Sequence, residues 1–137
     1  MIVCGIEIKG SQAILVSLDG SQASYKVVGL YLRRIKLDDH KDQARVQSFL
    51  TTILAYFSQE KIEIIGIRAR AASGSFAGGG VSFKIEGIIQ TQNVPVAIIA
   101  PQTLKARMAT VREMPDELTG YQKNAYDLAY YLLGQQP

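Results

Sequence analysis

The feature that most constrains the fold is a change in hydrophobic period near residue 40. Before it, apolar residues follow one another in extended runs that are separated by Gly, Ser and Asp. After it, apolar residues recur at steps of three and four: Val46, Phe49, Leu50, Ile53, Leu54 and Phe57. The first pattern is typical of strands, and the second of an amphipathic helix with one buried face. The chain is therefore predicted to fold as an α/β protein whose strands come first.

Three strands are predicted before that helix. The run "IVCGIEIKGSQAILVSLDG" is typical of two strands around a tight turn at residues 9–11. "DGSQ" at residues 19–22 is a second turn signal. A third extended run covers residues 25–37 and is interrupted at Gly29. Consecutive strands joined by short turns predict an antiparallel meander.

Strands and helices alternate in the rest of the chain. The expected strands cover residues 61–67 and 94–100, and the expected helices cover 81–92, part of 101–115, and the segment after Thr119. Thr119 and Gln122 have the spacing of a capping box, and Gly134 ends the last helix. The predicted order is β-β-β-α-β-α-β-α, in a single domain of residues 1–137.

Composition excludes several classes of function. With 47% hydrophobic and 20% charged residues, the chain can bury a core, and its net charge of +3 permits contact with a polyanion without requiring it. Cys4 is the only cysteine and His40 the only histidine, which excludes an intrachain disulfide and a Cys/His zinc site. No apolar run reaches the length of a membrane span, and there is no secretory leader pattern. We expect a soluble, cytoplasmic protein with no membrane partner.

Glu7 is the first candidate site residue. Every other residue from 2 to 8 is apolar or Gly, so this strand is predicted to be buried on both faces. An unpaired carboxylate in such a strand is costly, so Glu7 must be paired, hydrogen-bonded or bound to a metal.

The predicted element order resembles the ribonuclease H-like superfamily, which has a five-stranded mixed sheet with helices on both faces. Within it, "CGIEIKGSQAILVSLD" resembles the opening hairpin of RuvC-type Holliday junction resolvases, with Glu7 where that family has Asp. "NAYDLAYYLLG" resembles their closing helix, with Asn124 and Asp127 at the positions of its two acids. Arg68 stands where their fourth strand ends in Glu. "SFAGGGVSFKIEG" would be the signature of an uncharacterised bacterial family of this fold.

The resemblance implies a site for Mg²⁺ or Mn²⁺, since nucleases of this fold hold two metal ions with clustered carboxylates. Carried over, Glu7 and Asp127 become metal ligands and Asn124 becomes an amide ligand. Asp42 becomes a further catalytic acid, with Asp39 and Glu86 as the alternatives for that role. Capping of the first helix is the alternative for Asp42. Arg68 counts against the metal, because a guanidinium would repel it and form an ion pair with Glu7 or Asp127.

Basic residues near this expected site suggest contact with the backbone of DNA or RNA. Those predicted to bind nucleic acid are Arg68, Arg70, Lys84, Lys105 and Arg107. Ordinary solvated charges are the alternative. "FAGGGVSFK" precedes a helix, where backbone N–H groups can hold a phosphate, although a surface loop is the simpler interpretation.

Three functions stay open on the sequence alone. The first is a nucleic-acid-binding protein with a degenerate acidic site. The second is a working nuclease that depends on Mg²⁺ or Mn²⁺. The third is a scaffold that keeps the fold, with Glu7 and Arg68 as a structural salt bridge. Resolvases of this type are dimers, so a homodimer is implied by analogy. The tyrosines of the last helix are candidates for its interface or for the core: Tyr121, Tyr126, Tyr130 and Tyr131.

Overall fold

The computed structural model describes residues 1–70, 79–107 and 113–135. Its strands are β1 (Ile2–Lys9), β2 (Gln12–Gly20), β3 (Tyr25–Val28), β4 (Arg34–Lys36), β5 (Ile64–Arg68) and β6 (Val96–Ile99). Its helices are α1 (Gln43–Gln59), α2 (Gly80–Gln90), α3 (Pro101–Arg107), the short 3₁₀ helix η1 (Gly120–Gln122) and α4 (Lys123–Gly134). The phosphate-binding interpretation of "FAGGG" falls mainly on residues 71–78, which lie outside the described residues.

The strands form one mixed sheet in the order β3-β2-β1-β5-β6. β1 is antiparallel to β2 and parallel to β5, and β6 continues the parallel part beside β5. This arrangement confirms the predicted ribonuclease H-like sheet. One expected element differs, because the third extended run is divided into β3 and β4. Both pieces pair with β2, at its two ends, and Gly29 adopts a positive φ of 67° between them.

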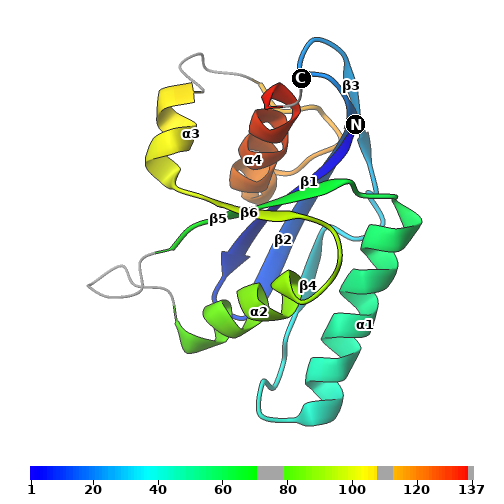
Figure 1. The fold of residues 1–137 in the computed structure, drawn as a ribbon, viewed down its shortest axis with the longest axis vertical. Coiled ribbons are helices and arrows are strands. Elements are labelled where there is room, and N and C mark those ends of the chain that lie inside the picture. The colour runs from blue at the N-terminus through cyan, green and yellow to red at the C-terminus, as the bar shows by residue number, and fades with distance from the viewer. Residues whose placement is uncertain (71–78, 108–112, 136–137) are drawn as a thin grey trace.

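Helices cover both faces of the sheet (Figure 1). α1 and α2 pack on one face, where Ile6, Ile53 and Ile85 share a hydrophobic core. α3 and α4 pack on the other face, where Val16, Leu104 and Leu128 share a second core. The capping box at Thr119 is confirmed, although it begins η1, which leads directly into α4. No helix among the described residues is long and apolar enough to cross a membrane.

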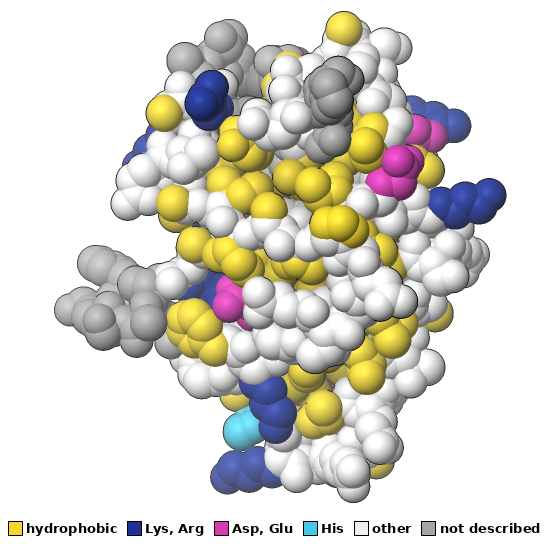
Figure 2. All heavy atoms as spheres, in the orientation of Figure 1, with side chains coloured by type: hydrophobic (Ala, Val, Ile, Leu, Met, Phe, Trp, Pro, Cys, Tyr) yellow, Lys and Arg dark blue, Asp and Glu magenta, His cyan; other side chains and the backbone are white. Residues whose placement is uncertain are grey.

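The β6 side of the molecule is partly apolar. β6 is an edge strand of the sheet, and Ile98 is exposed on it. Figure 2 shows hydrophobic side chains gathered across the middle of this face.

Two glycines let α4 lie directly on the sheet. Gly5 of β1 pairs with Gly66 of β5. A Cβ atom on Gly5 would lie within 2.6 Å of the backbone nitrogen of Ala129, and one on Gly66 would press on Leu132. Successive side chains of a strand alternate between faces, so Glu7 lies on the same face as Gly5, toward α4. The first turn of α4 is thereby held beside the end of β1.

Candidate functional site

Glu7 has a hydrogen-bond partner on α4. The side-chain amide of Asn124 donates to Glu7 Oε2 at 2.7 Å, and both side chains are half-buried. This bond meets the requirement that a carboxylate in a largely buried strand finds a partner. The salt bridge between Glu7 and Arg68 is not formed: among the described residues, each ion pair joins other side chains.

Asp127 lies one helical turn after Asn124 and is paired within α4. Lys123 Nζ lies 2.6 Å and 2.8 Å from the two carboxylate oxygens of Asp127. This is an i,i+4 pair in the first turns of the helix, with the Asp127 side chain 21% exposed. The negative charge of Asp127 is therefore balanced by its own helix.

Arg68 ends β5 on the same face as Glu7. It lies two residues after Gly66, as Glu7 lies two residues after Gly5, and those glycines are paired. A cavity of about 200 Å³ opens here, and it is lined by Arg68, Pro101, Leu104, Lys105, Asn124 and Asp127. The structure thus brings Arg68, Asn124 and Asp127 together around one hollow, with Lys105 of α3 on its wall.

A second cavity of about 320 Å³ lies on the other side of Asn124. It is lined by Glu7, Lys9, Gln12, Ile14, Arg34, Gly120, Tyr121, Lys123 and Asn124. The guanidinium carbon of Arg34 lies 5.1 Å from the ring centroid of Tyr121, which is the distance of a cation–π contact. Asn124 lines both cavities, so they adjoin at the Glu7–Asn124 pair.

Sequence reasoning missed Lys9, Arg34, Tyr121 and Lys123 as site residues. Ile14 of β2 pairs with Glu7 on one side and with Arg34 on the other, so β4 brings Arg34 across the sheet toward Glu7. The only signal was the alternation of basic and apolar residues in "LYLRRIKL". That pattern does not predict which strand β4 pairs with, because β4 and its partner β2 are separated in the sequence and their register is not set by local residues.

The residues at this end of the sheet do not fit a two-metal centre. The Asn124 NH₂ group points at Glu7, an ammonium group holds Asp127, and a guanidinium group shares the cavity. Within residues 1–70, 79–107 and 113–135, no three His, Cys, Asp or Glu side chains gather closely enough to hold a metal ion. Divalent cations prefer several oxygen ligands with net negative charge, and this set lacks them.

Asp42 is a helix cap in this structure. Its carboxylate accepts a hydrogen bond from the backbone N–H of Ala44 at 3.0 Å, at the N-cap of α1. α1 packs on the face of the sheet opposite α4, and Asp42 lines neither of the two cavities beside the Glu7–Asn124 pair. The capping alternative is the one that the geometry supports, and the acid carried over from ribonuclease H is not beside the Glu7–Asn124 pair.

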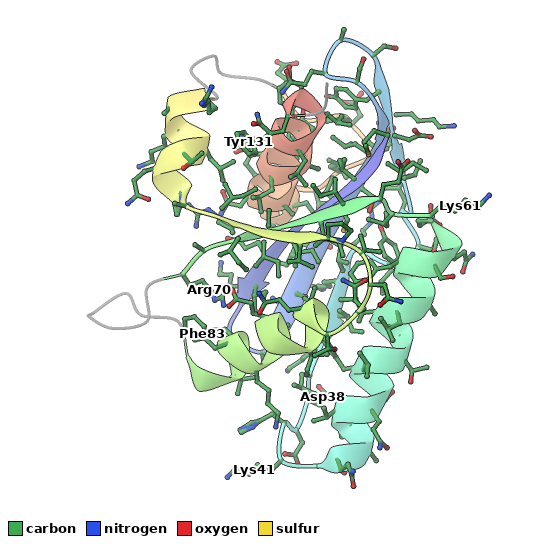
Figure 3. All side chains as sticks on the ribbon, in the orientation of Figure 1. Asp38, Lys41, Lys61, Arg70, Phe83 and Tyr131 are labelled. Atoms are coloured by element: carbon green, nitrogen blue, oxygen red, sulfur yellow. The ribbon has the colours of Figure 1, made fainter. Side chains whose placement is uncertain are left out.

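The predicted basic residues are divided among different roles. Arg70 is turned inward: its guanidinium donates to Glu86 at 3.0 Å and to Ser82 Oγ at 3.2 Å, and lies over the ring of Phe83 (Figure 3). It therefore fastens α2 to the end of β5. Lys84 donates to the backbone oxygen of His40, in the segment before α1. Their contact with nucleic acid stays a prediction.

Lys105 and Arg107 both lie on α3. Lys105 is exposed and shares the smaller cavity with Arg68, and Arg107 is exposed at the end of the helix.

Two of the interface candidates, Tyr126 and Tyr130, are buried in the core beneath α4, and Tyr126 bonds through its hydroxyl to Tyr25 at 2.6 Å. They complete the core, and the homodimer stays a prediction.

Solved structures with a similar fold include RuvC and a poxvirus Holliday junction resolvase. T. thermophilus RuvC in complex with a Holliday junction substrate is 14% identical, with a TM-score of 0.67 over 95% of this chain and 90% of that one. T. thermophilus RuvC alone is 15% identical, with a TM-score of 0.66 over 95% and 92%. Fowlpox virus resolvase with Holliday junction DNA is 10% identical, with a TM-score of 0.58 over 98% and 97%. At these identities, the likeness establishes the fold.

No curated protein matches the chain significantly. Residues 1–132 match the family described as "Protein of unknown function (DUF3010)". The chain belongs to this family, and its ribonuclease H-like fold is similar to that of the RuvC structures.

Proposed function

We propose that this protein binds nucleic acid at the α4 end of its sheet and does not hydrolyse it. The binding region is named here the cationic surface, and its charged members are Lys9, Arg34, Arg68, Lys105 and Lys123. These side chains line two adjoining cavities on either side of Asn124. The main support is that the two carboxylates between these cations already have partners: Glu7 is bonded to Asn124, and Asp127 to Lys123.

The charge balance of the surface favours phosphate. Five cationic side chains accompany two carboxylates, and Lys123 already compensates Asp127. Lys and Arg side chains supply most of the sequence-independent affinity for a nucleic-acid backbone, because binding releases condensed counterions. The resolvases of similar fold that were solved with Holliday junctions support a branched or duplex DNA among the ligands.

The same residues argue against hydrolysis. A two-metal nuclease needs several converging carboxylates, and here a guanidinium stands in the cavity that contains Asp127. Arg68 can instead hold a phosphate with its fork of N–H donors. The nuclease alternative would require Asp127 to leave Lys123, and it would leave Glu7 and Asp127 without a third acid beside them among the described residues.

Fluorescence anisotropy tests the proposal with labelled duplex and four-way junction DNA over a range of salt concentrations. The variant Arg68→Gln with Lys105→Gln removes two charges from one cavity. We expect its affinity to fall and the slope of log K against log salt to decrease by about 1.8, since each duplex phosphate contact contributes about 0.9. Lys26→Gln is the charge control, because Lys26 lies far from the two cavities. It stands opposite Asp19 of β2 in the sheet, and Asp19 is about 17 Å along β2 from Ile14, which stands opposite Glu7.

Two results would contradict the proposal. Wild-type protein without salt-dependent affinity for any nucleic acid would favour the scaffold function. Binding of Mn²⁺ by calorimetry that disappears in Glu7→Gln, together with metal-dependent cleavage of a junction, would favour the nuclease. We expect neither metal binding at millimolar Mn²⁺ nor cleavage.

A further inference from the structure

The larger of the two cavities has the composition of a nucleotide pocket. It lies between the ends of β1, β2 and β4 and the start of α4, and holds about 320 Å³. Its wall combines an aromatic ring, three cations and a carboxylate–amide pair: Tyr121, Lys9, Arg34, Lys123, Glu7 and Asn124. We propose that this cavity receives one unpaired nucleotide, so that the protein prefers single-stranded or splayed nucleic acid to a blunt duplex. This inference rests on the proposed function and names its ligand class.

The aromatic wall offers a stacking platform. Tyr121 is 39% exposed, and the guanidinium carbon of Arg34 lies 5.1 Å from the centroid of its ring. Both groups are planar and can stack with a base, because guanidinium planes and aromatic rings are the usual partners of unstacked bases. A base can stack on the outer side of the Arg34 guanidinium, or it can displace the guanidinium and stack directly on the Tyr121 ring. Either arrangement needs a base that has left its own helix.

The polar groups are arranged by depth. Glu7 and Asn124 are half-buried, whereas Lys9, Arg34 and Lys123 are exposed. The cations therefore lie at the rim, where a phosphate would remain solvated, and the carboxylate–amide pair lies deeper. A carboxylate and an amide together offer acceptors and donors to the edge of a base or to a sugar hydroxyl. This combination suits a whole nucleotide better than an isolated phosphate, which the half-buried carboxylate of Glu7 would repel.

A paired base cannot use this pocket. In a duplex, both faces of each base are stacked and its pairing edge is occupied, so a stacking platform contributes only when the base is splayed out. Among the described residues, those that line the Arg68–Lys105 cavity include no aromatic side chain, so they supply charge and no stacking platform. The two cavities thus separate the affinity for a backbone from the preference for an unpaired nucleotide.

The experiment compares one variant on two ligands. The probes are a fluorescein-labelled single-stranded oligonucleotide of about 12 nucleotides and its blunt duplex. We expect wild type to prefer the single strand. Tyr121→Leu should lower single-strand affinity roughly tenfold while changing duplex affinity less than about twofold, because only the stacked base is lost. Tyr121→Phe keeps the ring and should behave as wild type. Tyr31→Leu is the control for an exposed tyrosine, since Tyr31 lies on the α1 side against Glu60.

A second readout reports stacking directly. An oligonucleotide with 2-aminopurine loses fluorescence when that base stacks, and we expect a change on binding wild type that Tyr121→Leu abolishes. The proposal that the cavity receives an unpaired nucleotide would be contradicted by equal wild-type affinity for both probes, or by an unchanged single-strand affinity in Tyr121→Leu. The proposed function would survive that result if Arg68→Gln with Lys105→Gln still weakened binding. If wild type bound neither probe, both would be overturned.

Discussion

Glu7 is a carboxylate between cations on two sides. Lys9 and Arg34 line the cavity on one side of the Glu7–Asn124 pair, and Arg68 lines the cavity on the other. In a metal-dependent nuclease, a carboxylate here would be indispensable. In a protein that binds phosphate with its own cations, the same carboxylate opposes binding. The sign of its effect therefore separates the two functions.

Glu7→Gln should tighten binding of duplex DNA. The glutamine oxygen can still accept the hydrogen bond from Asn124, so the geometry is kept while one negative charge is removed. For a phosphate about 7 Å away in water, that charge is worth about 0.6 kcal/mol, or roughly a threefold gain in affinity. Anisotropy titration at low salt measures it. Glu63→Gln is the matched control, because Glu63 directly precedes β5 and lies at the end of that strand away from Arg68. Weaker binding by Glu7→Gln, with Glu63→Gln unchanged, would contradict our proposal.

At the scale of elements, the contact of α4 with β1 and β5 positions the site. Gly5 and Gly66 lie side by side beneath α4, and the absence of side chains there lets the helix backbone approach the sheet. That approach sets Asn124 within hydrogen-bond distance of Glu7. The site is thus built by a close helix–sheet contact whose requirement is steric.

Gly5→Ala should destabilise the protein strongly. Its new methyl group would lie 2.1 Å from the backbone oxygen of Ala125, so α4 has to move away from β1. We expect a loss of about 3 kcal/mol in the free energy of unfolding, measured by urea denaturation. Gly87→Ala is the control in α2: its Cβ meets nothing within 4 Å, so it should stabilise by about 0.5–1 kcal/mol. Equal stability of the two variants would show that the close contact is unnecessary.

At the scale of the whole molecule, the core beneath α1 and α2 carries ionisable groups that must stay neutral. Burial raises the pKa of Cys4 to about 12, against the opposing effect of a hydrogen bond with Ser17. Burial also raises the pKa of Tyr56, whose hydroxyl bonds to Ser17 at 2.6 Å. Each folded-state pKa lies above that of the unfolded chain, so the folded protein loses stability as pH rises.

Alkaline pH should therefore lower the free energy of unfolding, because the buried thiol and hydroxyl of this core lose their protons more readily in the unfolded chain. Below pH 9, the usual pKa of Cys4, both states keep the proton; from pH 9 toward 12, only the unfolded chain loses it. Cys4 alone then removes up to about 1.4 kcal/mol of stability per pH unit. Urea denaturation at about pH 8 and about pH 10 measures the slope. Cys4→Ala should have a shallower slope, and an unchanged slope would exclude the thiol as its source.

Much of the fold was predictable because it depends on local patterns. The change from extended runs to a helical stripe gave the element order, and the capping box located the start of the last helical segment. The exception was the third strand: residues 25–37 look continuous, yet β3 and β4 separate because each finds a different part of β2. That division depends on pairing with a distant segment, which sequence alone does not specify.

For the site, the sequence by itself determined that Glu7 needs a partner and that Arg68 replaces an expected acid. The first follows from residue type and from burial in a strand, and the second from the resemblance to RuvC-type resolvases, whose fourth strand ends in Glu. The tertiary structure alone decided that the partner is Asn124 and that Arg70 turns inward. It also brought Arg34 and Tyr121 beside Glu7. These contacts join segments far apart in the chain, or depend on which rotamer the packing permits, and the local sequence carries neither kind of information.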